Sequence, residues 1–188
     1  MKQYKTLLID PPWSQGIAGD YRNRPNAAQD LPYKTLSLDA IGQLPIQQWA
    51  HPEAHIWLWT TNQFLAAGFD LLKRWGCTYL APIHAIKPSG KGNYFVHRTQ
   101  TLLFAYKDKC VFPLERFRDN IIEVGNPKRH SQKWEKTYEY IESISPPPRL
   151  ELFARKTRKD WDVWGDEVDH DIPLLTPLAK VVDICLPV

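Results

Sequence analysis

Short apolar runs alternate along this chain with segments in which apolar residues recur every three or four positions. The runs predict buried strands, and the periodic segments predict amphipathic helices. The predicted strands cover residues 4–9, 54–60, 77–80, 83–86, 101–106, 121–124 and 149–154. The predicted helices cover residues 38–44 and 63–75, and a third runs to about residue 144. This alternation predicts an α/β fold, with a doubly wound, mostly parallel sheet and helices on both faces.

Residues that favour helix ends and strand breaks set the expected boundaries. Ser37 is a good N-cap for the first helix, and residues 61–62 offer a cap for the second. Gly76 suits the C′ position that ends this second helix. Pro82 is expected to divide the apolar stretch around it into two strands, because proline cannot donate a backbone hydrogen bond.

Two long polar segments are expected to be loops that reach a substrate. Residues 14–31 are rich in Gly, Asn, Asp, Gln and Arg, and residues 87–97 form the second segment. Loops of this length in a compact domain are usually functional or disordered. Gly90-Lys91-Gly92 lacks the spacing and the strand–helix context of a phosphate-binding loop. A flexible basic loop that approaches a substrate is therefore the favoured interpretation.

Composition and charge favour one soluble, intracellular domain. We expect a catalytic domain over residues 1–168 and a tail, 169–188, that packs on this domain or at a subunit contact. The net charge of +3 permits a polyanionic partner without requiring one. The three cysteines are widely spaced, which fits reduced thiols better than a disulfide framework. With no signal peptide and no apolar run of 18 residues, a cytoplasmic protein with no membrane contact is expected.

The sequence Asp10-Pro11-Pro12-Trp13 is the candidate centre of the chemistry. It follows the predicted strand 4–9, and ligands of open α/β sheets bind where such strands end. Neither proline has an N–H, so the turn is expected to be rigid, with its carbonyls outward and unpaired. Asp10 and the Pro11 carbonyl could each accept one N–H of an aromatic amine, while Trp13 stacks on its ring. The alternative is a plain Pro-Pro turn after a chance aspartate.

A second candidate lies in the most basic segment, residues 126–136, which includes Lys133. One interpretation is an anion site at a helix N-terminus, where backbone N–H groups and lysines converge on a carboxylate or phosphate. The other is a solvated helix start, and composition alone does not separate the two. No metal is expected: residues 169–171 (Asp-His-Asp) fit a surface acidic cluster better than a metal site, and no other His or Cys pair has zinc spacing.

Seven short motifs occur one after another along the chain between residues 10 and 167. They are Asp10-Pro11-Pro12-Trp13, Tyr33-Lys34-Thr35-Leu36-Ser37, Trp57-Leu58-Trp59-Thr60, Leu71-Leu72-Lys73-Arg74-Trp75-Gly76, Ser131-Gln132-Lys133, Leu150-Glu151-Leu152-Phe153-Ala154-Arg155 and Trp164-Gly165-Asp166-Glu167. In these motifs the chain resembles the adenine-N6 methyltransferases with a D-P-P-W motif. That family includes the catalytic subunit of the eukaryotic mRNA adenosine methyltransferase and small bacterial and phage enzymes. The resemblance implies a Rossmann-like fold, a permuted motif order and S-adenosylmethionine as cofactor.

The resemblance, together with the two polar segments, assigns expected site residues. The catalytic set is Asp10, Pro11, Pro12 and Trp13. The cofactor-binding set is Asp10, Lys133, Phe153, Arg155, Asp166 and Glu167. The substrate-binding set is Trp13, Tyr21, Arg22, Tyr33, Lys87 and Arg98. Two positions depart from the family pattern: Trp134 stands where Pro is usual, and Asp166 stands where Asn is usual.

The expected function is therefore S-adenosylmethionine-dependent N6-adenine methylation of nucleic acid. DNA is favoured over RNA because the chain is compact and lacks the extensions of the eukaryotic members. The alternatives are an RNA adenosine methyltransferase, a non-catalytic methyltransferase-like subunit, and an enzyme that methylates a side-chain amide or a small-molecule amine. A homodimer or a partner subunit is left open by the sequence.

Overall fold

The computed structural model describes residues 2–13, 35–91, 94–112, 118–125 and 133–172. Within them, seven strands form one sheet in the order β5-β3-β4-β2-β1-β6-β7. The strands are β1 Tyr4–Ile9, β2 Ala50–Thr60, β3 Thr78–Lys91, β4 His97–Tyr106, β5 Ile121–Glu123, β6 Arg149–Leu152 and β7 Trp161–Trp164. In that sheet only β4 is antiparallel to its neighbours, which confirms the mostly parallel sheet predicted from the sequence.

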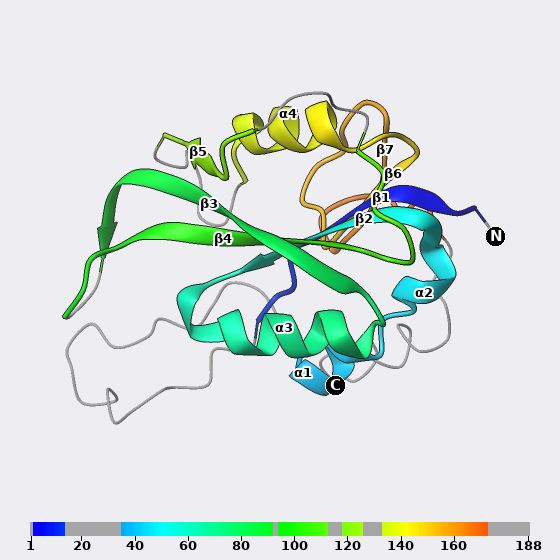
Figure 1. The fold of residues 1–188 in the computed structure, drawn as a ribbon, viewed down its shortest axis with the longest axis horizontal. Helices are drawn as coiled ribbons and strands as arrows, with labels where there is room; N and C mark the ends of the chain where they lie inside the picture. The colour runs from blue at the N-terminus through cyan, green and yellow to red at the C-terminus, as the bar shows by residue number, and fades with distance from the viewer. Residues whose placement is uncertain (1, 14–34, 92–93, 113–117, 126–132, 173–188) are drawn as a thin grey trace.

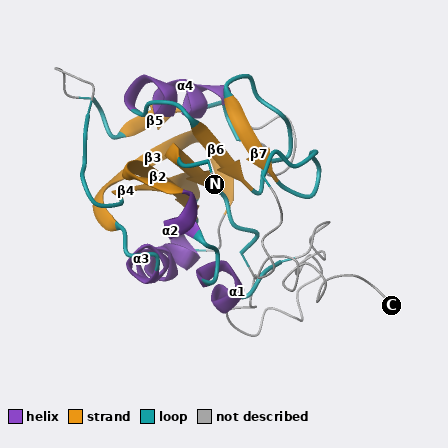
Figure 2. Ribbon diagram, turned by 90° about the vertical axis from the view of Figure 1, so that its right-hand side faces the viewer, coloured by secondary structure: helices purple, strands orange, loops and turns teal. Residues whose placement is uncertain are grey.

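Helices cover both faces of the sheet, as predicted (Figures 1 and 2). One face carries α1 Leu38–Gly42, α2 Ile46–Trp49 and α3 Leu65–Arg74, and the other carries α4 Glu135–Ile144. The side chains of β2 alternate between the two cores: Ile56 and Leu58 pack with the first group of helices, and Trp57 and Trp59 pack with α4. A strand buried on both faces must be apolar at successive positions, which is why this run was recognisable in the sequence.

Two of the three expected helix boundaries are confirmed. The Ser37 side chain accepts a hydrogen bond from the Ala40 N–H at 3.2 Å, as an N-cap does. Gly76 follows the end of α3 with φ at +64°, a conformation that glycine adopts without steric cost. The expected cap at residues 61–62 is wrong, because the Thr61 side chain makes no capping bond and a short 3₁₀ turn, Asn62–Phe64, precedes α3.

Pro82 does not break the chain into two strands, contrary to the sequence-based expectation. β3 continues through it, with an irregularity in register between Tyr79 and Ala81, and Pro82 lies opposite Leu103 of β4. On the other side, β5 pairs with β3 only from His84 onward. Residue 82 therefore lies on an exposed edge of the sheet, where the missing N–H of proline is tolerated.

The segment expected to be a second long loop is mostly a β-hairpin. β3 extends to Lys91 and β4 begins at His97. We refer to residues 87–100, the part of this hairpin that pairs with neither β5 nor β2, as the arm. Figure 1 shows it projecting past the end of β2, on the side where the parallel strands end.

The C-terminal part of the sheet also differs from expectation. β6 ends at Leu152, and the next residue, Phe153, has φ at +65°, so the strand stops two residues earlier than predicted. β7 was missed by the sequence analysis, although the alternating apolar and polar residues of Trp161–Trp164 are typical of a strand. Of the predicted tail, the structure describes residues 169–172, in which Asp171 accepts a hydrogen bond from the Val163 N–H. No helix in the described part of the chain is long and apolar enough to cross a membrane.

Candidate active site

Asp10 lies at the point where the chain reverses its direction of winding across the sheet. It directly follows β1, whose neighbours are β2 on one side and β6 on the other. The chain moves from β1 to β2 on the α1–α3 face and returns through α4 to β6 on the opposite face. Ligands of open α/β sheets bind at such a switch point, outside the carboxyl ends of the strands. The fold therefore places the carboxylate where a ligand is expected.

Lys133 meets Asp10 at this point. Its ammonium nitrogen lies 2.8 Å from Oδ2 of Asp10 and 4.7 Å from the ring centre of Trp59. The Lys133 side chain is 13% exposed and the Asp10 side chain 24% exposed, so the pair is shielded but reachable. α4 begins two residues later, and its N-cap, Trp134, makes no side-chain capping bond. The rest of the basic segment, residues 126–132, lies outside the described residues.

Residues 10–13, which we call the corner, contain a tight turn at the two prolines. Both proline carbonyls accept hydrogen bonds, whereas the sequence predicted unpaired carbonyls. The Trp13 N–H donates to the Pro11 carbonyl at 2.8 Å, and the Leu36 N–H donates to the Pro12 carbonyl at 2.9 Å. A carbonyl oxygen carries two lone pairs, so the Pro11 oxygen retains the capacity to accept a second hydrogen bond. Two residues with fixed φ leave this turn few alternative conformations, so its rigidity stays a prediction.

Trp13 does not present the open indole face that the sequence suggested. Its side chain is only 7% exposed and belongs to the core beneath α1 and α3. The indole stacks on Phe64 with ring centres 5.1 Å apart and an interplanar angle of 10°. One face of the ring is thus occupied by a core neighbour, and Trp13 supports the corner from the protein side.

The ends of β6 and β7 bring together the other residues expected to bind a cofactor. Arg155 lies 3.3 Å from Glu167 in an ion pair, and Asp166 beside it is exposed. Phe153 is half-buried against the edge of the Trp164 ring. Gly165 is required here, because a Cβ atom at this position would lie 2.6 Å from the Ala154 nitrogen and closer still to its oxygen.

One residue near this site was not identified from the sequence. Glu151 of β6 is 5% exposed, and its carboxylate accepts a hydrogen bond from the Tyr138 hydroxyl at 2.8 Å. Burial, helped by the negative charge of Asp10, raises the pKa of Glu151 to about 7, against the lowering effects of the Tyr138 hydrogen bond and of Lys133. A charged residue inside the apolar strand Leu-Glu-Leu was the signal that could have identified it.

The residues expected to bind a substrate are only partly described. Lys87 and Arg98 face one another across the arm, where the Arg98 Nε donates to the Lys87 carbonyl at 2.9 Å. Both lie on the arm rather than on a loop. Tyr21, Arg22 and Tyr33 lie outside the described residues.

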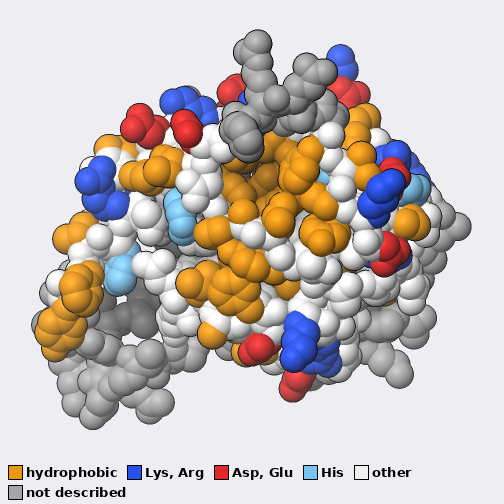
Figure 3. Space-filling view, viewed as in Figure 1, with side chains coloured by type: hydrophobic (Ala, Val, Ile, Leu, Met, Phe, Trp, Pro, Cys, Tyr) orange, Lys and Arg blue, Asp and Glu red, His pale blue; other side chains and the backbone are white. Residues whose placement is uncertain are grey.

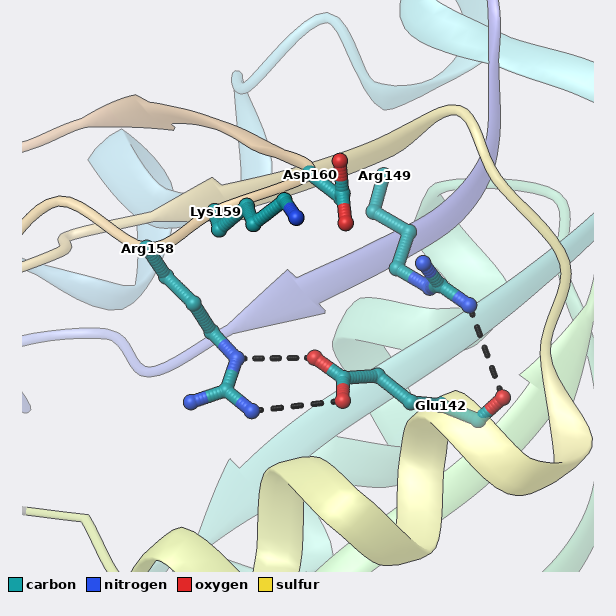
Figure 4. Close-up of a pocket in the computed structure, with 5 residues that line it drawn as sticks. All are labelled: Glu142, Arg149, Arg158, Lys159 and Asp160. Carbon is teal, nitrogen blue, oxygen red and sulfur yellow. Dashed lines mark hydrogen bonds and ion pairs between the residues drawn. The ribbon is translucent and has the colours of Figure 1, made fainter.

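A pocket of about 410 Å³ opens at the opposite edge of the sheet (Figure 4). Its polar groups bind one another: Arg158 donates to both carboxylate oxygens of Glu142, at 2.7 and 3.2 Å, and Arg149 donates to the Glu142 carbonyl. The guanidinium of Arg158 also lies 4.6 Å from the Tyr138 ring centre. This network joins α4 to the turn before β7, and we assign it a structural role.

Comparison with known proteins identifies the family to which the chain belongs. The MT-A70 family matches residues 4–167 of the chain, which include every described residue of the site. The type II methyltransferase M.MunI of a Mycoplasma species is 27% identical over 195 residues, covering 93% of this chain and 82% of the relative. The human N(6)-adenine-specific methyltransferase METTL4 is 27% identical, over 89% of this chain and 38% of the relative. The human N(6)-adenosine-methyltransferase catalytic subunit METTL3 is 26% identical, over 93% and 30%. The chain thus spans most of the bacterial relative but well under half of the two human ones.

Proposed function

This chain belongs to the MT-A70 family of S-adenosylmethionine-dependent adenine-N6 methyltransferases, and from that premise we propose that it methylates N6 of adenine in nucleic acid, with DNA favoured over RNA. The observation that carries the proposal is the Asp10–Lys133 pair at the switch point of the sheet. Two opposite charges, fixed side by side and partly shielded, suit a ligand that carries both charges itself.

The donor set fits S-adenosylmethionine. The cofactor carries an ammonium and a carboxylate on one carbon, and the carboxylate of Asp10 and the ammonium of Lys133 offer the complementary charges at 2.8 Å from each other. At the ends of β6 and β7, the carboxylates of Asp166 and Glu167 can accept hydrogen bonds from ribose hydroxyls, with Arg155 orienting Glu167. The half-buried ring of Phe153 offers an apolar surface beside them. These residues would hold the cofactor, which when bound supplies a methyl group on a sulfonium centre.

The corner residues would then act on the adenine amine. The lone pair of N6 is delocalised into the ring, so the amine is a poor nucleophile. Asp10 and the second lone pair of the Pro11 carbonyl would each accept one N–H, which favours a pyramidal nitrogen whose lone pair is localised and projects out of the ring plane. Most of the rate gain would come from positioning, and Asp10 would also stabilise the positive charge that develops on nitrogen.

Trp13 would have a different role from the stacking platform expected from the sequence. Its 7% exposure and its stack on Phe64 leave little of the ring available to a base. We assign it to positioning: it keeps the backbone of Pro11 and Pro12 in place while Asp10 contacts the substrate.

DNA is favoured over RNA on two grounds. The relative whose length the chain nearly spans is a type II methyltransferase, and METTL4 is named for the base adenine, whereas METTL3 is named for the ribonucleoside. In duplex DNA the target base must leave the stack before N6 can reach Asp10. The arm, which lies at the same edge of the sheet, is positioned to take part in that step.

The test is a methyl-transfer assay with a nucleoside readout. The protein is incubated with labelled S-adenosylmethionine and adenine-containing duplex DNA, single-stranded DNA or RNA, and the products are digested and identified by mass spectrometry. We expect N6-methyl-2′-deoxyadenosine, and a loss of at least a hundredfold in Asp10→Asn with Asp39→Asn, an exposed aspartate of α1, as control. Cofactor binding without transfer to any of the three substrates would show that the chain is a non-catalytic subunit. Transfer to RNA alone would refute the preference for DNA.

A further inference from the structure

The tip of the arm carries the most exposed large hydrophobic side chains in the part of the chain that the structure describes. Tyr94 is 87% exposed, Phe95 78% and Val96 63%, whereas the next, Ile121, is 50% exposed. Figure 3 shows hydrophobic side chains at the left-hand end of the molecule, where the arm turns back. Two adjacent aromatic rings that contribute nothing to the core indicate a contact with a partner.

The arm leaves the sheet at the edge that carries the candidate active site. Thr60 of β2 lies opposite Thr101 of β4, at the level of the edge where Asp10 follows β1. From Thr101, β4 continues four residues outward to His97, a reach of about 14 Å at roughly 3.4 Å per residue. The His97 ring is hydrogen-bonded at 2.9 Å to the side chain of Asn62, two residues after the end of β2. The tip is thus tied to the edge of the sheet that carries Asp10.

The arm also has a net positive charge, and its two strands lie close together near the tip. Residues 87–100 contain no Asp or Glu, but they include Lys87 and Arg98. The strands approach so closely near the tip that a Cβ atom on Gly90 would lie 2.7 Å from the His97 carbonyl carbon. Positive side chains beneath an aromatic tip match the chemistry of a nucleic acid, which presents phosphates outside its stacked bases.

We infer that Tyr94 and Phe95 insert into the base stack of duplex DNA beside the target adenine and fill the space that the extruded base leaves. This inference rests on the proposed function and adds the device that opens the duplex. Apolar wedges that partly unstack a base step are a general way for proteins to deform DNA, and base–aromatic stacking offsets a cost of the same order. Arg98 and Lys87 then lie where they can contact the flanking phosphates.

The size and shape of the tip favour DNA over a protein partner or a second copy of the chain. A stable protein interface buries about 800 Å² on each partner and involves some 20–30 residues. The tip offers three hydrophobic residues in succession, which is far fewer. The rings also stand at the end of a projection, as a wedge requires, rather than along a groove that could hold a single strand.

The experiment compares two pools of 24-base-pair duplexes with a central adenine and four randomised positions on each side. In one pool the adenine is paired with thymine, and in the other it faces an abasic site, so that it needs no opening. In the Tyr94→Ala/Phe95→Ala variant we expect methyl transfer to fall at least tenfold on the paired pool and less than twofold on the abasic pool. Leu80→Ala, which removes an exposed side chain from the other end of β3, is the control and should change neither rate.

A second measurement separates this inference from the proposed function. With 2-aminopurine in place of the central adenine, the native protein should raise the fluorescence of the paired pool, and the double variant should not. If the native protein raises it but transfers no methyl group, the proposed function fails and the wedge stands. Equal losses on both pools, no loss on either, or no fluorescence change with the native protein would overturn the wedge. Dimerisation lost in the double variant, with duplex opening unchanged, would overturn it in favour of a second copy.

Discussion

The ammonium of Lys133, just before α4, lies 2.8 Å from the carboxylate of Asp10, just after β1. Neither residue has another ion-pair partner among the ion pairs of the described residues. The pair joins the two segments that meet at the switch point, and it places two opposite charges side by side there. Two motifs that lie far apart in the sequence therefore meet at one point of the fold.

Replacing Lys133 with glutamine should weaken cofactor binding far more than it weakens the fold. A hydrogen bond to a charged group contributes about 1.5–3 kcal/mol, which corresponds to roughly a ten- to hundredfold rise in Kd for S-adenosylmethionine. Calorimetric titration measures this change. Lys5→Gln is the matched control, because Lys5 forms a half-exposed ion pair with Glu53 near the opposite edge of the sheet. An equal rise in Kd for both variants would contradict the assignment of Lys133.

Gly165→Ala should separate the ends of β6 and β7. The new Cβ atom would overlap the backbone of Ala154, which is not a flexible side chain and cannot move aside. We expect a loss of about 2 kcal/mol or more in the free energy of unfolding, together with weaker cofactor binding. Gly125→Ala is the control, since no atom of the described residues lies within 4 Å of a Cβ at that position. Urea unfolding of the two variants measures the difference, and similar values for both would refute the close approach.

Glu151→Gln should change how stability depends on pH. The folded protein holds the Glu151 proton up to a pKa of about 7, whereas the unfolded chain releases it near 4.5. Between these values the unfolded state binds fewer protons, so this residue lowers stability as pH rises, by about 1.4 kcal/mol per pH unit in the steepest case. Glutamine keeps an oxygen that can accept from Tyr138 and removes the titration. The variant should therefore gain stability relative to the native protein from pH 5 to pH 8 in denaturant unfolding, and a constant difference would contradict this.

Trp13→Ala should unfold more easily than the native protein, and not only lose activity. Truncating a large aromatic side chain in a core costs roughly 3–5 kcal/mol. Trp13→Phe retains a ring against Phe64 and should keep most of the stability and activity. Phe69→Ala is the control, because Phe69 is an aromatic residue of α3 that is 38% exposed. A Trp13→Ala protein with native stability but no methyl transfer would instead support direct stacking on the base.

The parts of the fold that were predicted correctly depend on local sequence features. The apolar runs of β1 and β2, the Ser37 cap and Gly76 each depend on a few neighbouring residues, so the sequence contains the information directly. The errors occurred where pairing with strands distant in the sequence decides the local structure. Pro82 continues a strand because β5 does not reach it, and the arm is a hairpin because β3 and β4 pair along its length.

The site also depends partly on local sequence features and partly on contacts between distant segments. By itself, the sequence determined that a carboxylate and a rigid turn end a buried strand, and that a basic segment precedes a helix, because strand burial and proline geometry are local properties. The tertiary structure decided that Lys133 meets Asp10, that Trp13 lies in the core, and that Glu151 is buried beneath the pair. These contacts join segments brought together only by the parallel order of β2, β1 and β6. No local preference encodes that order, since it depends on how the whole sheet buries its two faces.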